Sequence, residues 1–98
     1  MDSKEQARVR RVEIRYCPKC GWLPRATWIA QELLQTFGEE LSEVALIPAA
    51  PGTLEVWSGS ELVWTRSSGH SVPELKALKA KLRDTIAPDK DLGHSEPA

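Results

Sequence analysis

Cys17 and Cys20 are the only cysteines of this 98-residue chain, and two residues separate them. Two thiols at this spacing can close a small disulfide ring and open it again, which is a reversible two-electron couple. A thiolate attacks the disulfide of another molecule, and the second thiol then displaces the product from the mixed disulfide. The pair therefore predicts thiol-disulfide chemistry that needs no bound cofactor and no metal.

A strand is expected to lead into this pair, and a helix to follow it. Val12, Ile14 and Tyr16 alternate with charged residues, so a half-buried strand is expected within residues 7–16. Apolar residues then recur every three or four positions, which predicts a helix with Pro24 in its first turn. The apolar stripe of this helix consists of Ala26, Ile29, Ala30, Leu33, Leu34, Phe37 and Leu41.

The start of this helix decides how strongly it can assist a thiolate. A helix N-terminus stabilises a nearby anion through its unpaired N–H groups and its dipole. A turn that begins at Pro18 would bring these groups to the sulfurs, whereas a helix that begins at Pro24 leaves Cys20 upstream of them. Both starts remain open at this point. Lys19 and Arg25 add positive charge of the right sign in either case.

The rest of the chain predicts three further strands and a second helix. Strands are expected at 43–48, 53–57 and 61–66, and the last two of them form a hairpin. Ser71 and Glu74 make a capping-box pattern ahead of the second helix. The apolar stripe of that helix is Leu75, Leu78, Leu82 and Ile86, and its solvated face is expected to carry Lys76, Lys79, Lys81 and Arg83.

The element order is therefore β-α-β-β-β-α. Because the strands alternate polar and apolar residues, one face of the sheet should be buried and the other open. Both helices can then cover the same face of a four-stranded mixed sheet. This is an α/β two-layer sandwich, and a cysteine pair after its first strand makes it thioredoxin-like. Residues 1–98 are expected to form this single domain, with 1–6 and 89–98 as flexible tails.

Composition narrows the classes of function. The net charge of −1 argues against a nucleic-acid partner or an anionic membrane surface. No apolar run approaches the roughly 20 residues that span a bilayer, and the polar first residues carry no secretory signal. We therefore expect a cytoplasmic protein. In the cytoplasm a C-x-x-C pair is more often catalytic, redox-sensing or metal-binding than a structural disulfide.

Two other interpretations of the cysteines compete with redox chemistry. A zinc site usually needs four ligands, but there is one C-x-x-C pair, and His70 and His94 are far from it in sequence. Two inert, buried cysteines are the other interpretation, which a C-x-x-C spacing directly after a strand disfavours. Redox chemistry is therefore the preferred interpretation.

Four tryptophans are many for a chain of this length. Trp22 follows the cysteines and is expected to wall their site or to contact a substrate chain. Trp64 is expected in the core, on the same strand face as Leu62. Trp57 should lie on the open face of the sheet, and Trp28 opposite the apolar stripe of the first helix. Exposed tryptophans of this kind can mark an interface, and the alternative is that loops, the N-terminal segment or the tail cover them.

The segment Pro51, Gly52 and Thr53 leads into the third strand. In thioredoxin-like folds this segment faces the cysteine loop, and its backbone pairs with an extended substrate. We therefore expect these three residues beside the dithiol, as substrate-binding residues. A cis bond before Pro51 and an ordinary turn are both open.

The sequence VEIRYCPKCGW at 12–22 resembles the opening of the selenoprotein W-like family, also called the Rdx family. GTLEV at 52–56 and ELVW at 61–64 resemble its later strands, with Leu54 in place of the usual Phe, and DLGHS at 91–95 resembles the tail of its bacterial branch. The resemblance implies a thioredoxin-like fold. It also implies thiol redox chemistry with protein or small-molecule partners, namely glutathione or thioredoxin-type reductants.

The resemblance also bears on which sulfur attacks. In thioredoxins the first cysteine attacks, which points to Cys17. In selenocysteine-containing members of the family, selenium occupies the second position, which corresponds to Cys20. Because selenium is placed where nucleophilicity matters, we expect Cys20 to have equal or greater thiolate character, with Cys17 as the resolving thiol.

Two functional hypotheses follow. The first is a thiol-disulfide oxidoreductase in which Cys17 and Cys20 are catalytic. The residues expected to shape its site are Tyr16, Pro18, Lys19, Gly21 and Trp22. The second is a non-catalytic protein-binding module or redox sensor whose dithiol switches its affinity for a partner. A homo-oligomer through the open sheet face or an edge strand is compatible with both.

Overall fold

The computed structural model describes residues 10–66 and 75–92. The elements run in the order β1 (Arg11–Tyr16), α2 (Leu23–Thr36), β2 (Glu43–Pro48), β3 (Leu54–Ser58), β4 (Glu61–Thr65) and α3 (Leu75–Ile86). This is the predicted β-α-β-β-β-α order. The predicted capping box of Ser71 and Glu74, and both histidines, lie outside the described residues.

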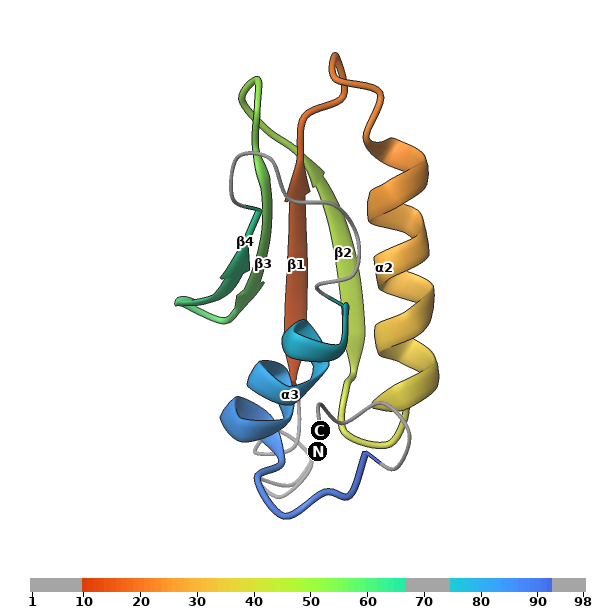
Figure 1. Cartoon of the computed structure of the whole chain (residues 1–98), viewed down its shortest axis with the longest axis vertical. Helices are drawn as coiled ribbons and strands as arrows, with labels where there is room; N and C mark the ends of the chain where they lie inside the picture. The colour runs from red at the N-terminus through yellow and green to blue at the C-terminus, as the bar shows by residue number, and fades with distance from the viewer. Residues whose placement is uncertain (1–9, 67–74, 93–98) are drawn as a thin grey trace, which may run out of the picture.

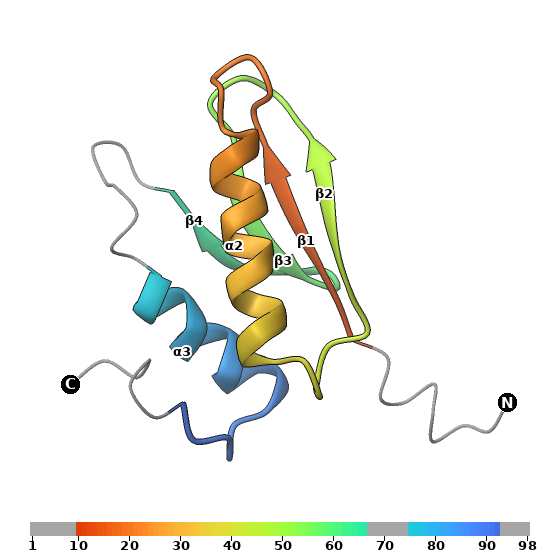
Figure 2. The same cartoon turned by 90° about the vertical axis from the view of Figure 1, so that its right-hand side faces the viewer.

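The strands form one mixed sheet in the order β2-β1-β3-β4. β1 pairs parallel with β2 and antiparallel with β3, and β3 pairs antiparallel with β4. A parallel pair needs a crossover connection, and α2 supplies it between β1 and β2. Figure 1 shows α2 running along the sheet, and Figure 2 shows α2 and α3 on the same side of it. The fold is therefore the expected thioredoxin-like two-layer sandwich.

The core lies between the sheet and the helices. The alternation along β1 and β3 buries one face of these two central strands, and the periodicity of α2 and α3 presents a matching apolar stripe to it. The central buried side chains are Val12, Ile14, Val56, Ala26, Ile29, Leu33, Leu78 and Leu82. Within the described part of the chain, neither helix is long and apolar enough to cross a membrane.

A β-bulge changes the predicted faces of β4. The register shifts between Val56 and Trp57, so that Trp64 pairs with Val56 and Leu62 pairs with Trp57. Trp64 packs against the core as expected, but Leu62 is 43% exposed and Val63 is buried. The prediction that Trp64 and Leu62 share a face is wrong, because a bulge adds one residue and interrupts the alternation.

Two helix residues also differ from the prediction. Leu34 was expected in the apolar stripe of α2 but is 45% exposed, since Leu33 and not Leu34 faces the sheet. Lys79 was expected on a solvated face of α3 but is buried. Its Nζ donates a hydrogen bond to Glu32 Oε1 of α2 at 3.1 Å, which supplies the partner that a buried ammonium requires.

The segment after α3 is anchored to the fold. Leu92 is buried in the core, and Lys90 Nζ lies 3.3 Å from Glu40 Oε2. Residues 89–92 belong to the segment that was expected to be a flexible tail. In the structure this segment contacts the fold through the buried side chain of Leu92 and through the ion pair of Lys90 with the loop after α2.

Candidate redox site

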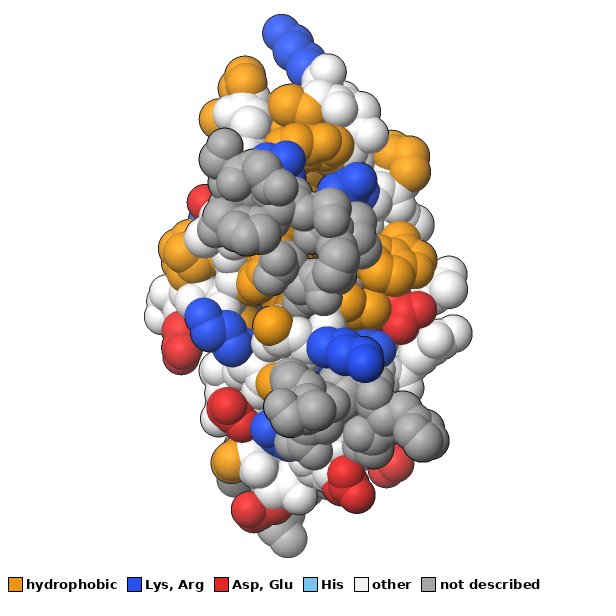
Figure 3. All heavy atoms as spheres, viewed as in Figure 1, with side chains coloured by type: hydrophobic (Ala, Val, Ile, Leu, Met, Phe, Trp, Pro, Cys, Tyr) orange, Lys and Arg blue, Asp and Glu red, His pale blue; other side chains and the backbone are white. Residues whose placement is uncertain are grey.

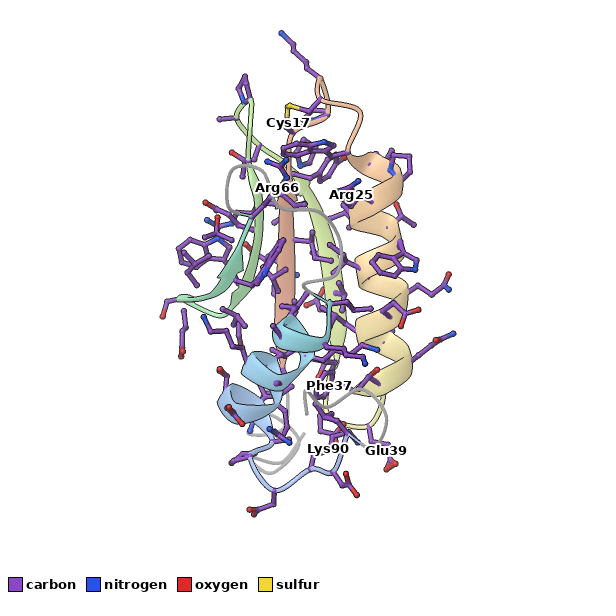
Figure 4. All side chains as sticks on the ribbon, viewed as in Figure 1. Cys17, Arg25, Phe37, Glu39, Arg66 and Lys90 are labelled. Atoms are coloured by element: carbon purple, nitrogen blue, oxygen red, sulfur yellow. A yellow bond between two sulfur atoms is a disulfide. The ribbon has the colours of Figure 1, made fainter. Side chains whose placement is uncertain are left out.

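Cys17 directly follows β1, and Cys20 lies in a turn ahead of α2. Gly21 N–H donates to Pro18 O at 3.1 Å, which closes the turn. Gly21 has a φ of 73°, a left-handed conformation that glycine adopts without steric cost. The Cα atoms of the two cysteines are 5.3 Å apart, and their sulfurs form a disulfide. Figure 4 shows this bond at one end of the molecule, in the loop between β1 and α2.

The helix begins at Leu23, so the later of the two predicted starts is the observed one. Cys20 therefore precedes the first helical turn, and the donors that reach the sulfurs come from loop backbone. Cys20 N–H donates to Cys17 Sγ at 3.1 Å, and Gly52 N–H donates to Cys20 Sγ at 3.4 Å. A hydrogen bond to an ionised acceptor is stronger than one to a neutral acceptor, so both donors favour thiolate forms of these sulfurs.

The two cysteines differ sharply in accessibility. Cys17 is 1% exposed and lies against the core, whereas Cys20 is exposed at the surface. An outside sulfur therefore meets Cys20 first. Attack on Cys20 Sγ would break the disulfide and leave Cys17 as the departing thiolate, whose sulfur already accepts the N–H of Cys20. The geometry thus separates an exposed sulfur, that of Cys20, from a buried one, that of Cys17.

A second loop, Pro51, Gly52 and Thr53, approaches the dithiol as expected. Thr53 N–H donates to Ala50 O at 3.1 Å, and Gly52 has a φ of 82°. This turn aims Gly52 N–H at Cys20 Sγ. Pro51 and Gly52 are exposed and Thr53 is half-buried. All peptide bonds in the described segments are trans, so the bond before Pro51 belongs to an ordinary turn.

Tyr16 supports the cysteine loop from inside the protein. It is buried at the end of β1, opposite Pro48 of β2 and Leu54 of β3. Its carbonyl oxygen accepts a hydrogen bond of 2.7 Å from Ala49 N–H, which continues the pairing to the edge of the loop. Pro18 and Lys19 lie at the exposed tip of the turn, in contrast.

Trp22 is held by a residue that the sequence did not single out. The ring of Trp22 is half-buried and packs against the core. Arg66 Cζ lies 4.8 Å from the ring centroid, which is a cation–π distance. Arg66 directly follows β4, and its N–H donates to Leu54 O at 3.0 Å. The contact joins segments far apart in sequence, so the sheet topology is needed to reveal it.

A shallow groove of about 400 Å³ borders the cysteine loop and the first turns of α2. Its lining residues are Gly21, Trp22, Pro24, Arg25 and Trp28. Trp28 is 37% exposed, as expected from its position opposite the apolar stripe. In Figure 3, apolar side chains gather at this end of the molecule and along α2, with basic side chains among them.

The open face of the sheet carries a separate charge network. Glu13 accepts from Arg15 Nη2 at 2.9 Å and pairs with Arg11 at 3.2 Å. The pKa of Glu13 is lowered, chiefly by the hydrogen bond from Arg15 and against the effect of burial. The pKa of Arg11 is raised, chiefly by its hydrogen bond to Glu43. Arg15 also stacks on Trp57 at 4.3 Å, which confirms Trp57 on the open face.

Metal ligands do not gather in the residues that the structure describes. Across 10–66 and 75–92, no group of three or more His, Cys, Asp or Glu side chains lies close enough together to hold an ion.

These observations define a thioredoxin-like α/β protein with a cysteine pair at its strand-to-helix loop. A sequence model described as the Rdx family matches residues 11–84. A Bordetella parapertussis protein of known structure is 44% identical with a TM-score of 0.71, and the match covers 79% of this chain and 98% of that one. A selenoprotein W-related protein from Vibrio cholerae is 42% identical with a TM-score of 0.71, covering 79% and 96%.

No curated protein matched the chain. Because the family match spans well over half of its length, the chain belongs to the Rdx family, the selenoprotein W-like proteins that its motifs resemble.

Proposed function

We propose that this protein is a thiol-disulfide oxidoreductase in which Cys20 exchanges with the sulfur of another molecule and Cys17 resolves the mixed disulfide. One observation carries the proposal: the two sulfurs are bonded to each other, yet Cys20 is exposed and Cys17 is 1% exposed. A purely structural disulfide needs no such division. An exchange reaction uses it, because the attacking sulfur must be accessible to a substrate, whereas the resolving sulfur needs to reach only the attacking one.

The reduced protein would reduce a substrate disulfide in two displacements. Cys20 thiolate attacks one substrate sulfur, so that a Cys20–substrate bond forms, the substrate disulfide breaks, and the departing sulfur takes up a proton. Cys17 thiolate then attacks Cys20 Sγ, which forms the protein disulfide and releases the second substrate thiol. Two electrons pass from the protein to the substrate. The two cysteine thiols release two protons when they ionise to thiolates, and the two departing substrate sulfurs take up two protons, so the reaction balances.

The surrounding residues have roles consistent with this reaction. Gly52 N–H would stabilise the attacking thiolate, and the loop Pro51–Thr53 would lie along the substrate backbone. Lys19 adds positive charge at the tip of the turn. The electron donors that fit the proposal are glutathione or a thioredoxin-type protein, and the compartment that fits it is the cytoplasm, where such reductants return the electrons.

Single-cysteine variants test the proposed roles of Cys20 as the attacking thiol and Cys17 as the resolving thiol. Each reduced variant is mixed with bis(2-hydroxyethyl) disulfide, and the adduct is measured by mass spectrometry. Cys17→Ser should form a stable mixed disulfide on Cys20, because no resolving thiol remains. Cys20→Ser should form its adduct at least about tenfold more slowly, since a buried thiol exchanges slowly. Equal rates for the two variants would contradict the proposal.

A redox sensor is the second candidate, favoured by exposed apolar side chains beside the dithiol. Leu23 is 46% exposed and Trp28 is 37% exposed, both on the first turns of α2. A sensor would switch its affinity for a partner when the disulfide closes. The two candidates differ in turnover: with excess glutathione, an oxidoreductase reduces many equivalents of the small disulfide, whereas a sensor reacts once at a rate that does not sustain catalysis.

The reduction potential separates both candidates from a structural disulfide. A cycling dithiol should equilibrate with a glutathione buffer near the cytosolic poise. A potential below about −300 mV is typical of structural disulfides and would argue against either candidate. The measurement uses the wild-type protein alone, so it depends on no variant.

A further inference from the structure

We infer that the groove beside the cysteine loop binds the chain of a disulfide-containing polypeptide, and that Arg25 selects a carboxylate side chain near the substrate cysteine. The inference rests on the proposed function and adds the substrate class. The groove is lined by Gly21, Trp22, Pro24, Arg25 and Trp28, of which the first two directly follow Cys20 in the chain. A chain whose sulfur is bonded to Cys20 would therefore have the groove immediately beside it.

Arg25 is the charged group of this groove, and no carboxylate of the described residues pairs with it. Its side chain is half-buried, and no carboxylate lies among the lining residues. Among residues 10–66 and 75–92, Arg25 forms no hydrogen bond or ion pair. Arg11 and Arg15 on the open face are, by contrast, both paired with carboxylates. A half-buried guanidinium without a partner has its full fork of donors available for a bidentate carboxylate.

A second guanidinium reinforces the positive charge at this end. Arg66 stacks on Trp22, and its Nε is buried without a hydrogen-bond partner in the described structure. Figure 4 shows Arg66, from the end of β4, and Arg25, from α2, on the side of the cysteine loop that faces the rest of the molecule. Trp22 is common to both guanidinium groups, since it lines the groove with Arg25 and stacks with Arg66. This end therefore presents an electropositive, aromatic surface to a substrate.

The two tryptophans indicate a polypeptide and not only a small thiol. Trp22 and Trp28 supply apolar walls, and tryptophan and arginine are enriched among the residues that contribute most to the binding energy of protein interfaces. About 400 Å³ is space for several side-chain groups around the one that carries the sulfur. The open shape of the groove suits an extended segment, with the carboxylate on Arg25 and a neighbouring apolar group against the indoles.

The test uses single-turnover oxidation of the pre-reduced protein by matched disulfide peptides. The peptides differ only in Glu, Gln or Lys next to their cysteine, and unreacted protein thiols are counted by alkylation. Each rate is divided by the rate with neutral bis(2-hydroxyethyl) disulfide, so that a general change in thiolate reactivity cancels. Wild type should prefer the Glu peptide over the Lys peptide by about tenfold, which is the scale of a well-formed ion pair.

Variants and salt then assign the preference to Arg25. Arg25→Gln should reduce the Glu-to-Lys ratio to within about twofold of one, and Arg25→Glu should invert it. Lys81→Glu, an equal charge reversal on the exposed surface of α3, should keep the wild-type ratio. Raising the ionic strength from about 50 mM to about 500 mM should weaken the wild-type preference without any substitution, because salt screens an exposed pair.

The outcomes distinguish this inference from the function on which it rests. Failure of wild type to react with any of the disulfides would refute the oxidoreductase proposal and the groove assignment together. Normal reaction with the neutral disulfide, but with no Glu preference or with a preference that survives Arg25→Gln, would refute the groove assignment alone. An Arg25 dependence seen with glutathione disulfide and absent from the peptides would also overturn it, since the occupant would then be a small thiol.

Discussion

The two ends of the sandwich differ in how many of their side chains are buried or paired. The end with the cysteine pair leaves several side chains exposed, and the end with Phe37 contributes to the core. At the cysteine end, Cys20 and Leu23 are exposed and Arg25 has no carboxylate partner in the described chain. At the other end, Phe37 is completely buried and Lys90 is paired with Glu40. Figure 4 shows Cys17 and Phe37 at these opposite ends. The cysteine end leaves apolar side chains and a guanidinium without partners among the described residues, whereas the other end buries Phe37 and pairs Lys90 with Glu40.

This contrast shows where the fold can tolerate an exposed reactive group. The end with Phe37 and Leu92 contributes buried apolar area, which is the dominant favourable term in folding. At the cysteine end, Cys17 and Tyr16 are also buried, and two hydrogen bonds hold the loops: Gly52 N–H donates to Cys20 Sγ, and Ala49 N–H donates to Tyr16 O. A loop held in this way can expose the sulfur of Cys20 to solvent while the core beneath it stays buried.

The largest effect on stability is expected from truncating Phe37, the completely buried side chain at the end opposite the cysteines. Phe37→Ala should lower the free energy of unfolding by about 3–5 kcal/mol, because it leaves a cavity in a fully buried site. Urea denaturation measures it. In the fraction that stays folded, alkylation of reduced Cys20 should remain within about twofold of wild type, since distant sites act independently.

Leu34→Ala is the matched control for this prediction. Leu34 lies near Phe37 in the chain but is 45% exposed, so its truncation should cost less than about 1 kcal/mol. Similar losses for the two variants would contradict the assignment of Phe37 to the supporting core. A large change in thiol reactivity with Phe37→Ala would contradict the independence of the two ends.

A smaller effect is expected from substituting two glycines. Gly52 lies beside the cysteine pair, and Gly59 lies in the turn between β3 and β4. Gly52 and Gly59 have φ of 82° and 59°, and added Cβ atoms would meet nothing within 4 Å. Alanine at either site should therefore cost about 1 kcal/mol through backbone conformation alone. Only Gly52→Ala should also change the dithiol, because Gly52 N–H donates to Cys20 Sγ.

The reduction potential is the readout that separates the two glycine variants. Disturbing the Gly52 hydrogen bond should destabilise the thiolate more than the disulfide and lower the potential by about 10–30 mV, where 30 mV corresponds to about 1.4 kcal/mol. Gly59→Ala should keep the wild-type potential. Equal shifts in both variants would mean that the contact has no specific effect on the redox couple.

The smallest effect is expected on the open face of the sheet. The pKa of Glu13 is lowered, chiefly by Arg15, so its contribution to stability is present above its ordinary pKa and is lost as the pH falls through the lowered value. The stability difference between wild type and Glu13→Gln should shrink below about pH 4.3. Thermal unfolding across the acid range measures it. High salt should reduce the same difference, and a difference that grows on acidification would contradict the sign.

Much of the fold was predictable because local patterns and packing agree. The alternation of Val12, Ile14 and Tyr16 gave β1 its buried face, and the spacing of Ala26, Ile29 and Leu33 gave α2 its own. The bulge near Val63, the burial of Lys79 and the anchoring of Leu92 were not predictable from the same patterns. The burial of Lys79 and of Leu92 depends on partners distant in the chain, and the bulge interrupts the alternation within one hairpin; local periodicity records neither.

The candidate site divides in the same way. The C-x-x-C spacing indicated the dithiol, and the loop at Gly52 was expected beside it. The unequal exposure of Cys17 and Cys20 was not predictable. It depends on the conformation of the turn at Gly21, in which Cys20 is exposed and Cys17 lies against the core. The stacking of Arg66 on Trp22 required the sheet order itself.

Competitive labelling of the two thiols tests the central claim most directly. Fully reduced wild-type protein is treated near neutral pH with less than one equivalent of iodoacetamide, and the alkylated cysteine is identified by peptide mapping. The exposure of Cys20 and the burial of Cys17 predict that most of the label is on Cys20. Predominant labelling of Cys17 would contradict the account.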